Sequence, residues 1–296
     1  MNDTAFVLGG GGALGAYQAE VARRIAPSFN LCGITGVSVG ALNGSILAQK
    51  DTEKLKGIWK ETRKNDVWTG GHTPWRYLNL ILGRKLGLYS SDPLYENIKK
   101  YFDPNDARIP FQAGSVNLET GEYVEYNINP DETYTSDEIR RARKFVCASA
   151  AIPGAVEPIQ VDENRTMMVD GGIRNMAPIS DALDFNPDRV IVILNIPTRE
   201  DFLSNQESPS HIFDVGMSAI ETLINETTIN DIKTARKINQ AVKNTNAEFS
   251  EYKRVDIDVI SPSAPLGSPQ DFSLDAYRNR IEVGKKDANE FLDRKT

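Results

Sequence analysis

The apolar positions of this chain fall first into a short continuous run and then into a stretch of helical spacing. Residues 4–8 form the run, and four glycines at residues 9–12 follow it directly. Between Leu14 and Ile25, apolar side chains recur at intervals of three and four residues, which is typical of one helix face. The segment therefore predicts a strand, a tight glycine loop and a helix.

The same order repeats immediately downstream. Residues 31–35 read as a short strand, residues 36–40 as a glycine-flanked turn, and residues 41–48 as the start of a helix. Alternating strands and helices favour a parallel sheet. Residues 189–194 are almost entirely apolar, as expected of a central strand that is buried on both faces. We predict an α/β fold whose mostly parallel central sheet is covered by helices on both faces, in three layers.

The remaining patterns predict further elements without dividing the chain. Helices are expected over residues 52–64, 92–102, 136–151, 211–244 and 273–292, and strands over residues 111–116, 123–128, 166–169 and 255–260. Residues 66–90 are irregular and aromatic. Since no repeat or low-complexity tract interrupts the pattern, we expect one domain over residues 4–292.

Composition narrows the functional class. A net charge of −7 and a pI near 5.1 argue against nucleic acid as a partner and against permanent adsorption to anionic membranes. Cys32 and Cys147 lie far apart in sequence and indicate no disulfide framework. No signal-like segment and no apolar stretch of 18 residues occur. We expect a cytoplasmic protein with at most transient contact to membranes; the sequence does not set its oligomeric state.

The turn at residues 36–40 carries the first candidate for chemistry. It reads Gly36-Val37-Ser38-Val39-Gly40, a G-x-S-x-G pattern between a strand and a helix. On such a turn the serine hydroxyl projects out of the sheet, and the flanking glycines permit the close backbone approach. The pattern makes Ser38 a candidate nucleophile at the positive end of a helix.

The glycine loop is open to more than one interpretation. Gly10-Gly11-Gly12-Ala13-Leu14-Gly15 satisfies the G-x-G-x-x-G pattern of dinucleotide-binding proteins, but no acidic residue for a ribose occurs between residues 20 and 51. No Gly-Lys-Ser/Thr follows, which excludes a P-loop. The amides of Gly10, Gly11 and Gly12 are better suited to an oxyanion hole. A merely structural glycine turn is the remaining alternative.

A candidate base follows a later strand. Asp170-Gly171-Gly172 comes directly after residues 166–169, and the carboxyl ends of strands are where open α/β sheets bind ligands. An ordinary Asp-Gly turn is the alternative.

Histidine is scarce, with only His72 and His211 in the chain. Ser38, Asp170 and His211 occur in the chain order of α/β-hydrolase triads. His211 nevertheless lies where a helix is expected to begin, and His72 lies in an irregular segment. If neither histidine serves as base, an aspartate has to take the serine proton directly.

Together these motifs resemble the patatin-like phospholipase family. The matching blocks are G-G-G-G-A-L-G-A-Y-Q-A (residues 9–19), G-V-S-V-G-A-L-N (residues 36–43), A-S-A-A-I-P-G (residues 148–154) and D-G-G (residues 170–172). The resemblance runs from residue 4 to about residue 292. It implies Ser38 as nucleophile, Asp170 as base, Gly10 to Gly12 as oxyanion hole, and Gly15, Gly36, Gly40, Gly171 and Gly172 as supporting glycines. Leu14 departs from the family, in which many members carry a cation at this position.

The resemblance implies a lipid acyl hydrolase that cleaves phospholipids or lysophospholipids through an acyl-enzyme, without metal or other cofactor. Transfer of the acyl group to another acceptor and non-catalytic lipid binding are the alternatives, and we expect water to be the acceptor. Apolar and cationic side chains alternate in residues 66–90. They predict either a lid that contacts lipid or an inserted helix packed against the core.

Overall fold

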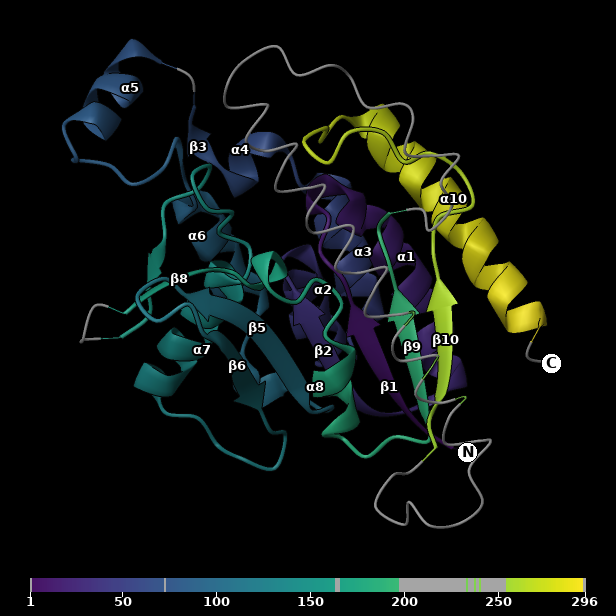
Figure 1. The fold of residues 1–296 in the computed structure, drawn as a ribbon. Coiled ribbons are helices and arrows are strands. Elements are labelled where there is room, and N and C mark those ends of the chain that lie inside the picture. The colour runs from purple at the N-terminus through teal and green to yellow at the C-terminus, as the bar shows by residue number, and fades with distance from the viewer. Residues whose placement is uncertain are drawn as a thin grey trace.

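The computed structural model describes residues 2–71, 73–162, 166–196 and 254–294, together with Lys233, Lys237 and Gln240. In this part of the chain a central sheet has the strand order β10-β9-β1-β2-β5-β8-β7, and β6 pairs with β5 (Figure 1). The strands of this sheet are β1 (Asp3–Leu8), β2 (Asn30–Val37), β5 (Phe111–Asn117), β6 (Tyr123–Ile128), β7 (Ile159–Gln160), β8 (Met167–Asp170), β9 (Arg189–Ile193) and β10 (Asp256–Ile260).

Helices and one small ribbon surround this sheet. The described helices are α1 (Gly15–Ile25), α2 (Val39–Leu47), α3 (Thr52–Glu61), α4 (Lys64–Val67), α5 (Pro74–Ile81), α6 (Asp92–Tyr101), α7 (Ser136–Ala148), α8 (Ile179–Leu183) and α10 (Leu274–Asp293). Short 3₁₀ helices are η1 (Gly12–Leu14), η2 (Ala26–Ser28), η3 (Pro104–Asp106) and η4 (Gly171–Ile173). The ribbon consists of β3 (Thr69–Gly70) and β4 (Tyr89–Ser90).

The predicted α/β class is confirmed. In the described part of the central sheet, strands β10, β9, β1, β2 and β5 are parallel, and the pairs of β5 with β6, of β5 with β8 and of β8 with β7 are antiparallel. Parallel neighbours place the carboxyl ends of β1, β2 and β9 at one edge of the sheet. The glycine loop, Ser38 and the residues after β9 therefore meet at that edge.

Alternating side chains of β1 build the three layers. Phe6 and Leu8 pack into the large apolar cluster that includes residues of α1, α2 and α10, whereas Ala5 and Val7 pack into a second cluster with residues of α8. Since both faces are covered, residues 5–8 of the strand are continuously apolar instead of alternating with polar residues. Helices therefore lie on both sides of the sheet (Figure 1).

Some elements differ from the sequence-based prediction. Helix α7 begins at Ser136 as predicted but ends at Ala148 instead of residue 151. Thr135 is its N-cap, because the Thr135 and Glu138 side chains bond reciprocally to backbone amides in a capping box. Residues 66–90, predicted to be irregular, contain the eight-residue helix α5. Most of the helix expected over residues 211–244 lies outside the described residues, although Lys233, Lys237 and Gln240 are helical. None of the described helices is long and apolar enough to cross a bilayer.

Candidate active site

Ser38 lies on the sharp turn between β2 and α2. Its backbone has φ 57° and ψ −128°, a conformation that non-glycine residues rarely adopt and that marks functional turns. The flanking glycines are sterically required: a Cβ on Gly40 would collide with the carbonyl oxygen of Leu8, and one on Gly36 with the carbonyl of Gly40. The helix thus approaches the strand closely enough to hold Ser38 at its N-terminus.

Asp170 reaches Ser38 across strand β5. In the sheet register Val37 pairs with Gly114, and the next residue of β5, Ser115, pairs with Asp170. Ser38 and Asp170 therefore lie level on either side of β5. Because β8 runs antiparallel to β5, Asp170 does not lie at the end of a parallel strand as the sequence argument assumed.

Burial raises the pKa of the Asp170 carboxyl and makes its ionised form a stronger base. The residue is only 5% exposed, and this burial raises the pKa of Asp170 to about 7. Hydrogen bonds to the carboxylate from the Ser38 side chain and the Gly172 amide lower that pKa and only partly offset the burial. A pKa near neutrality suits a group that has to accept a proton from a hydroxyl.

A buried serine, Ser149, links the turn that carries Ser38 to strand β5. The Ser149 hydroxyl accepts a hydrogen bond from the Ser38 amide (2.9 Å) and donates one to the Gly114 carbonyl (2.6 Å). Ser149 is fully buried, and the neighbouring Ala151 carbonyl accepts from the Asp170 amide (2.9 Å). Residues 148–154 resemble a block of the family, but no pattern in the sequence gives Ser149 a role. The structure shows that this block braces the backbone of both Ser38 and Asp170.

The glycine loop lies directly beside Ser38. A Cβ placed on Gly10 would come within 3.1 Å of the Ser38 Cβ, and the Gly10 amide donates to the Met176 sulfur (3.0 Å). Gly11 and Gly12 have φ values of 147° and 56°, which favour glycine. No described residue accepts a hydrogen bond from the Gly11 amide. The loop therefore presents backbone amides close to the serine.

The remaining motif glycines permit close contacts. A Cβ on Gly15 would collide with Val39, and one on Gly171 would lie 2.5 Å from the Gly114 carbonyl oxygen. A Cβ on Gly172 would lie 3.0 Å from an Asp170 carboxylate oxygen. The structure thus brings together all ten residues selected from the sequence for this site.

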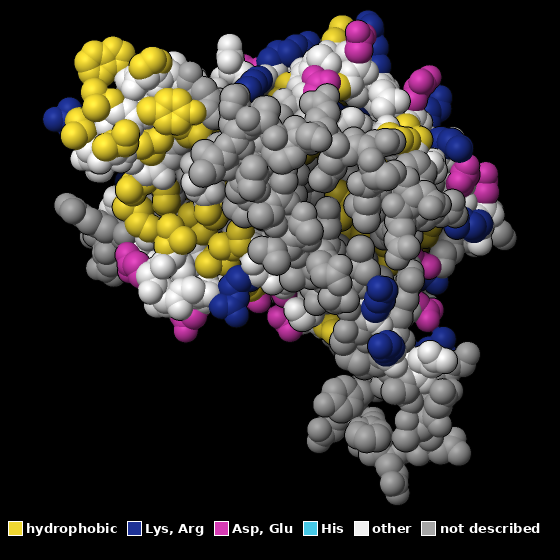
Figure 2. Space-filling model, turned by 45° about the horizontal axis from the view of Figure 1, so that its top comes forward, with side chains coloured by type: hydrophobic (Ala, Val, Ile, Leu, Met, Phe, Trp, Pro, Cys, Tyr) yellow, Lys and Arg dark blue, Asp and Glu magenta, His cyan; other side chains and the backbone are white. Residues whose placement is uncertain are grey.

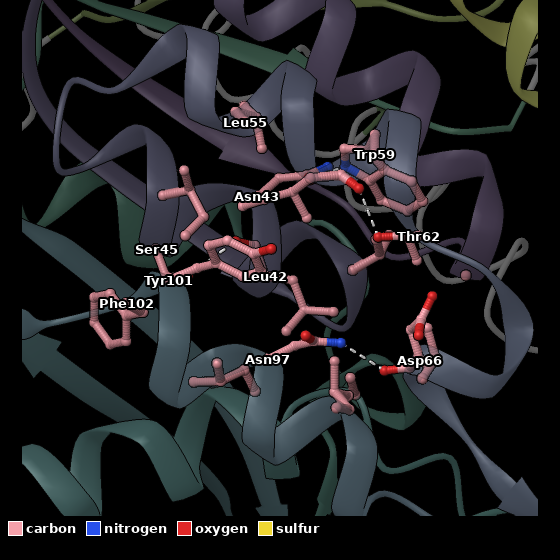
Figure 3. A pocket seen from close by; sticks show the side chains of 18 of the residues that line it. Leu42, Asn43, Ser45, Leu55, Trp59, Thr62, Asp66, Asn97, Tyr101 and Phe102 are labelled. Atoms are coloured by element: carbon pink, nitrogen blue, oxygen red, sulfur yellow. Dashed lines mark hydrogen bonds between the residues drawn. The ribbon is translucent and has the colours of Figure 1, made fainter.

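A pocket of about 360 Å³ opens from Ser38 between helices α2, α3, α4 and α6 (Figure 3). Its wall is mainly apolar, and Asn43, Trp59 and Asn97 form hydrogen bonds within the protein: the Trp59 indole donates to Asn43 (2.8 Å), and Asn97 donates to the Asp66 carbonyl (2.8 Å). The apolar lining residues are Val39, Leu42, Ile46, Leu55, Ile58, Val67, Leu94, Ile98, Phe102, Ala150, Ile152 and Phe272. The pocket has the size and apolar character of a small-ligand site.

Neither histidine can be placed in this site, because His72 and His211 both lie outside the described residues. Within the described ranges, no group of three or more His, Cys, Asp or Glu residues is arranged to hold a metal ion. The chemistry that the described geometry offers is therefore that of a buried serine hydroxyl, a carboxylate and backbone amides.

The comparison with family models agrees with the motifs. The family model for patatin-like phospholipases matches residues 6–183, which contain Ser38 and Asp170. Among solved structures, the chain is similar to VipD from Legionella pneumophila, with a TM-score of 0.44 and 15% sequence identity over 98% of this chain and 67% of that chain. No curated protein sequence matches the chain.

Proposed function

The chain belongs to the patatin-like phospholipase family, whose model matches more than half of it, and we propose that it hydrolyses acyl esters of phospholipids or lysophospholipids. Ser38 is the proposed nucleophile and Asp170 the proposed base. The observation that carries the proposal is the position of these two buried side chains level with each other across β5, where Ser38 also lines an apolar pocket. Family membership supports action on lipid esters in general.

The proposed reaction has two steps through an acyl-enzyme. The Ser38 oxygen attacks the ester carbon while Asp170 takes the hydroxyl proton, and Asp170 returns this proton to the departing alcohol as the C–O bond breaks. Asp170 then accepts a proton from a water molecule that attacks the acyl-enzyme. Breakage of the Ser38 ester releases the fatty acid, and the proton returns to the Ser38 oxygen.

The negative oxygen of each tetrahedral intermediate is proposed to bind to the amides of Gly10, Gly11 and Gly12. The Met176 sulfur, which now accepts from Gly10, is a weak acceptor that an oxyanion would displace readily. Backbone amides held in place by the fold need little reorganisation at the moment when charge develops.

The pocket is the proposed site of the acyl chain. Ser38 and Gly12 line it together with the apolar residues of α2, α3 and α6. An acyl chain placed there would lie between these helices, with Ser38 in the pocket wall. Burial of its methylene groups contributes about 0.8 kcal/mol each, so the wall favours a fatty acyl group over a short polar one.

Helix α5 is the proposed point of contact with the lipid surface. Figure 2 shows a group of apolar side chains over this protruding helix; Trp75 is 73% exposed, Ile81 82% and Leu82 51%. The helix lies between β3 and β4 in the chain, and β3 directly follows Trp68, which lines the pocket. Exposed aromatic and aliphatic residues of this kind insert into the interface of a bilayer.

We expect replacement of Trp75, Ile81 and Leu82 by serine to lower the activity on phospholipid vesicles about tenfold or more. A loss of that size corresponds to about 1.4 kcal/mol of interfacial binding, a small part of what burial of three such side chains provides. Hydrolysis of a soluble short-chain ester should change by less than about twofold, because the three side chains do not line the pocket.

The matched control carries serine at Leu118 and Leu183, which are also exposed but lie on other elements. The control should retain vesicle activity. Equal losses on vesicles and on the soluble ester would show that the α5 side chains support the fold and do not contact lipid.

The pKa of Asp170 predicts the pH dependence. Only the ionised carboxylate accepts a proton, so kcat/KM should rise about tenfold per pH unit below the midpoint and level off above it. With the pKa at about 7, the midpoint should lie near pH 7. Initial rates on an uncharged soluble ester between pH 5 and 9 measure this directly. A midpoint near pH 4, the ordinary value for aspartate, would contradict the assignment.

The proposed activity is tested by incubating the purified protein with a mixture of phospholipids and lysophospholipids. Mass spectrometry should detect free fatty acids and the matching deacylated lipids in equal amounts. Addition of glycerol as a competing acceptor separates hydrolysis from transfer. If most of the acyl groups then appear in a new ester at modest glycerol concentration, the protein is an acyltransferase.

A further inference from the structure

A buried side-chain amide binds the outer side of the glycine loop. Asn195 follows β9 and is 1% exposed; its Nδ2 donates to the carbonyls of Gly9 (3.1 Å) and Gly10 (2.9 Å). The fully buried Gln18 adds a second amide, which joins the Gly9 carbonyl (2.9 Å) to that of Ile193 (2.9 Å). Two carbonyls of the loop are therefore held by side chains from separate elements.

Because of the geometry of the peptide bond, the hydrogen bonds to these carbonyls also determine the direction of the neighbouring backbone amides. In a trans peptide the C=O and N–H groups point in opposite directions. The Gly9 carbonyl shares its peptide with the Gly10 amide, and the Gly10 carbonyl shares its peptide with the Gly11 amide. When Asn195 holds both carbonyls, the amides of Gly10 and Gly11 have to face away from Asn195.

The contacts of the glycine loop show which residues lie on the side that faces away from Asn195. The Gly10 amide points to Met176, whose side chain also approaches Gly172 beside Asp170. Gly10 is the residue of the loop that comes closest to the Ser38 side chain. The Gly10 amide therefore points to the side of the loop where Met176 and Gly172 lie, and peptide geometry turns the Gly11 amide away from Asn195 as well.

Backbone contacts hold the two ends of the loop, where the Gly9 amide donates to the Ile193 carbonyl (3.3 Å) and the Gly11 carbonyl accepts from the Leu14 amide (3.1 Å). Among the described residues, Asn195 alone donates to the Gly10 carbonyl. The glycines of the loop have no side chains that could pack against the protein. Because they lack a Cβ, Gly11 and Gly12 can also adopt backbone conformations other than the observed ones, with φ 147° and 56°. The contact is also costly, since no described residue gives the Asn195 Oδ1 a hydrogen bond. An apolar side chain would avoid this cost but would leave the Gly10 carbonyl without its side-chain donor.

We propose that Asn195 is a positioning residue that orients the Gly10 and Gly11 amides toward the developing oxyanion. It does so without touching the substrate. The inference rests on the proposed Ser38–Asp170 hydrolase and adds a residue to it that lies outside the motifs. It predicts that loss of the amide lowers the rate of the chemical step and leaves substrate binding unchanged.

The test replaces Asn195 by alanine and measures hydrolysis of a soluble p-nitrophenyl ester. We expect kcat to fall about 10- to 100-fold, somewhat less than the 10²–10³ lost with a complete oxyanion donor, because the amides remain present but less well oriented. KM should stay within about threefold, and the midpoint of the pH profile should not move, because Asp170 is untouched.

The matched control is Asn105→Ala, which also removes an amide with two hydrogen bonds to backbone, here to Tyr134. Asn105 lies in η3 and does not line the pocket. This variant should keep the wild-type kcat. Thermal unfolding of both variants shows whether they fold. If Asn195→Ala does not fold, Asn195→Asp is measured at pH 8 in its place.

Labelling by a fluorophosphonate provides a second readout. The phosphoryl oxygen of the probe occupies the same hole when Ser38 displaces fluoride, so the labelling rate should fall in parallel with kcat. A folded Asn195 variant with kcat within about threefold of wild type would overturn the inference. So would a loss shared by Asn105→Ala, or a shifted pH midpoint. If the wild-type protein neither hydrolyses the ester nor takes the label, the proposed function itself fails.

Discussion

Replacement of Ser38 by alanine should abolish ester hydrolysis, with a loss of about 10⁴-fold or more. The hydroxyl supplies the attacking oxygen, and loss of the nucleophile disables the whole unit in serine hydrolases. The fold should survive, because the bond from the Ser38 amide to the Ser149 hydroxyl is made by the backbone. Alanine also tolerates φ 57° no worse than serine does.

The measurement compares initial rates on phospholipid and on a soluble ester, with circular dichroism and thermal unfolding as the check on folding. Ser45→Ala is a suitable control. This serine also lies on α2 and lines the pocket, and its hydroxyl donates only to the carbonyl of Leu42. Activity of the folded Ser38→Ala protein above a few per cent of wild type would exclude Ser38 as the nucleophile.

Replacement of Asp170 by asparagine should reduce activity by about 10⁴-fold as well, because an amide cannot take the serine proton at any pH. This prediction separates a base from a mere orienting group. The side chain stays nearly the same size, so the Gly172 contact can be kept by the amide oxygen. Recovery of activity at high pH would indicate that another group activates Ser38.

The same substitution should stabilise the protein at pH 8. The pKa of Asp170 is about 7 in the folded state against an ordinary value of 3.8. Well below pH 4 the Asp170 carboxyl is protonated in both the folded and the unfolded protein. Between pH 4 and 7 the unfolded state loses its proton first, so the free energy of unfolding of the wild type falls as pH rises. Above pH 7 this cost reaches up to about 4 kcal/mol.

Asp170→Asn has no carboxyl at this position and avoids that cost. Denaturant unfolding at pH 5 and pH 8 should therefore show a stability gain that is larger at pH 8. A variant that is equally stable relative to wild type at both pH values would show that the carboxyl is not desolvated as the structure indicates.

Local steric requirements explain why the glycine loop and the Ser38 turn could be recognised from sequence. Gly36 and Gly40 have to be glycine because the strand and helix touch there, and such a constraint leaves a motif. The sequence also selects Asp170 as a candidate base, although by an incomplete argument, and its role stays a prediction. The pairing of Ser115 with Asp170 joins strands that are distant in sequence, and no local pattern reveals that β8 is antiparallel.

The supporting residues could not be predicted in this way. Ser149 and Asn195 bind backbone groups more than 100 residues away, so their roles depend on the completed fold. A weak signal does exist for Asn195: it is the first polar residue after the apolar run 189–194, at the carboxyl edge of the sheet. For residues 66–90 the sequence predicts either a lid that contacts lipid or a helix packed against the core. The exposure of Trp75 and Ile81 favours the lid, and contact with lipid stays a prediction.

The most direct test of the account is the rate of fatty-acid release from phospholipid by four folded proteins measured side by side. These are the wild type, Ser38→Ala, Asp170→Asn, and a double variant in which His72 and His211 are both alanine. The account predicts that the first two variants are inactive and that the protein without histidine keeps at least about half of the wild-type rate. A histidine-free protein as inactive as Ser38→Ala would contradict it and would assign the role of base to histidine.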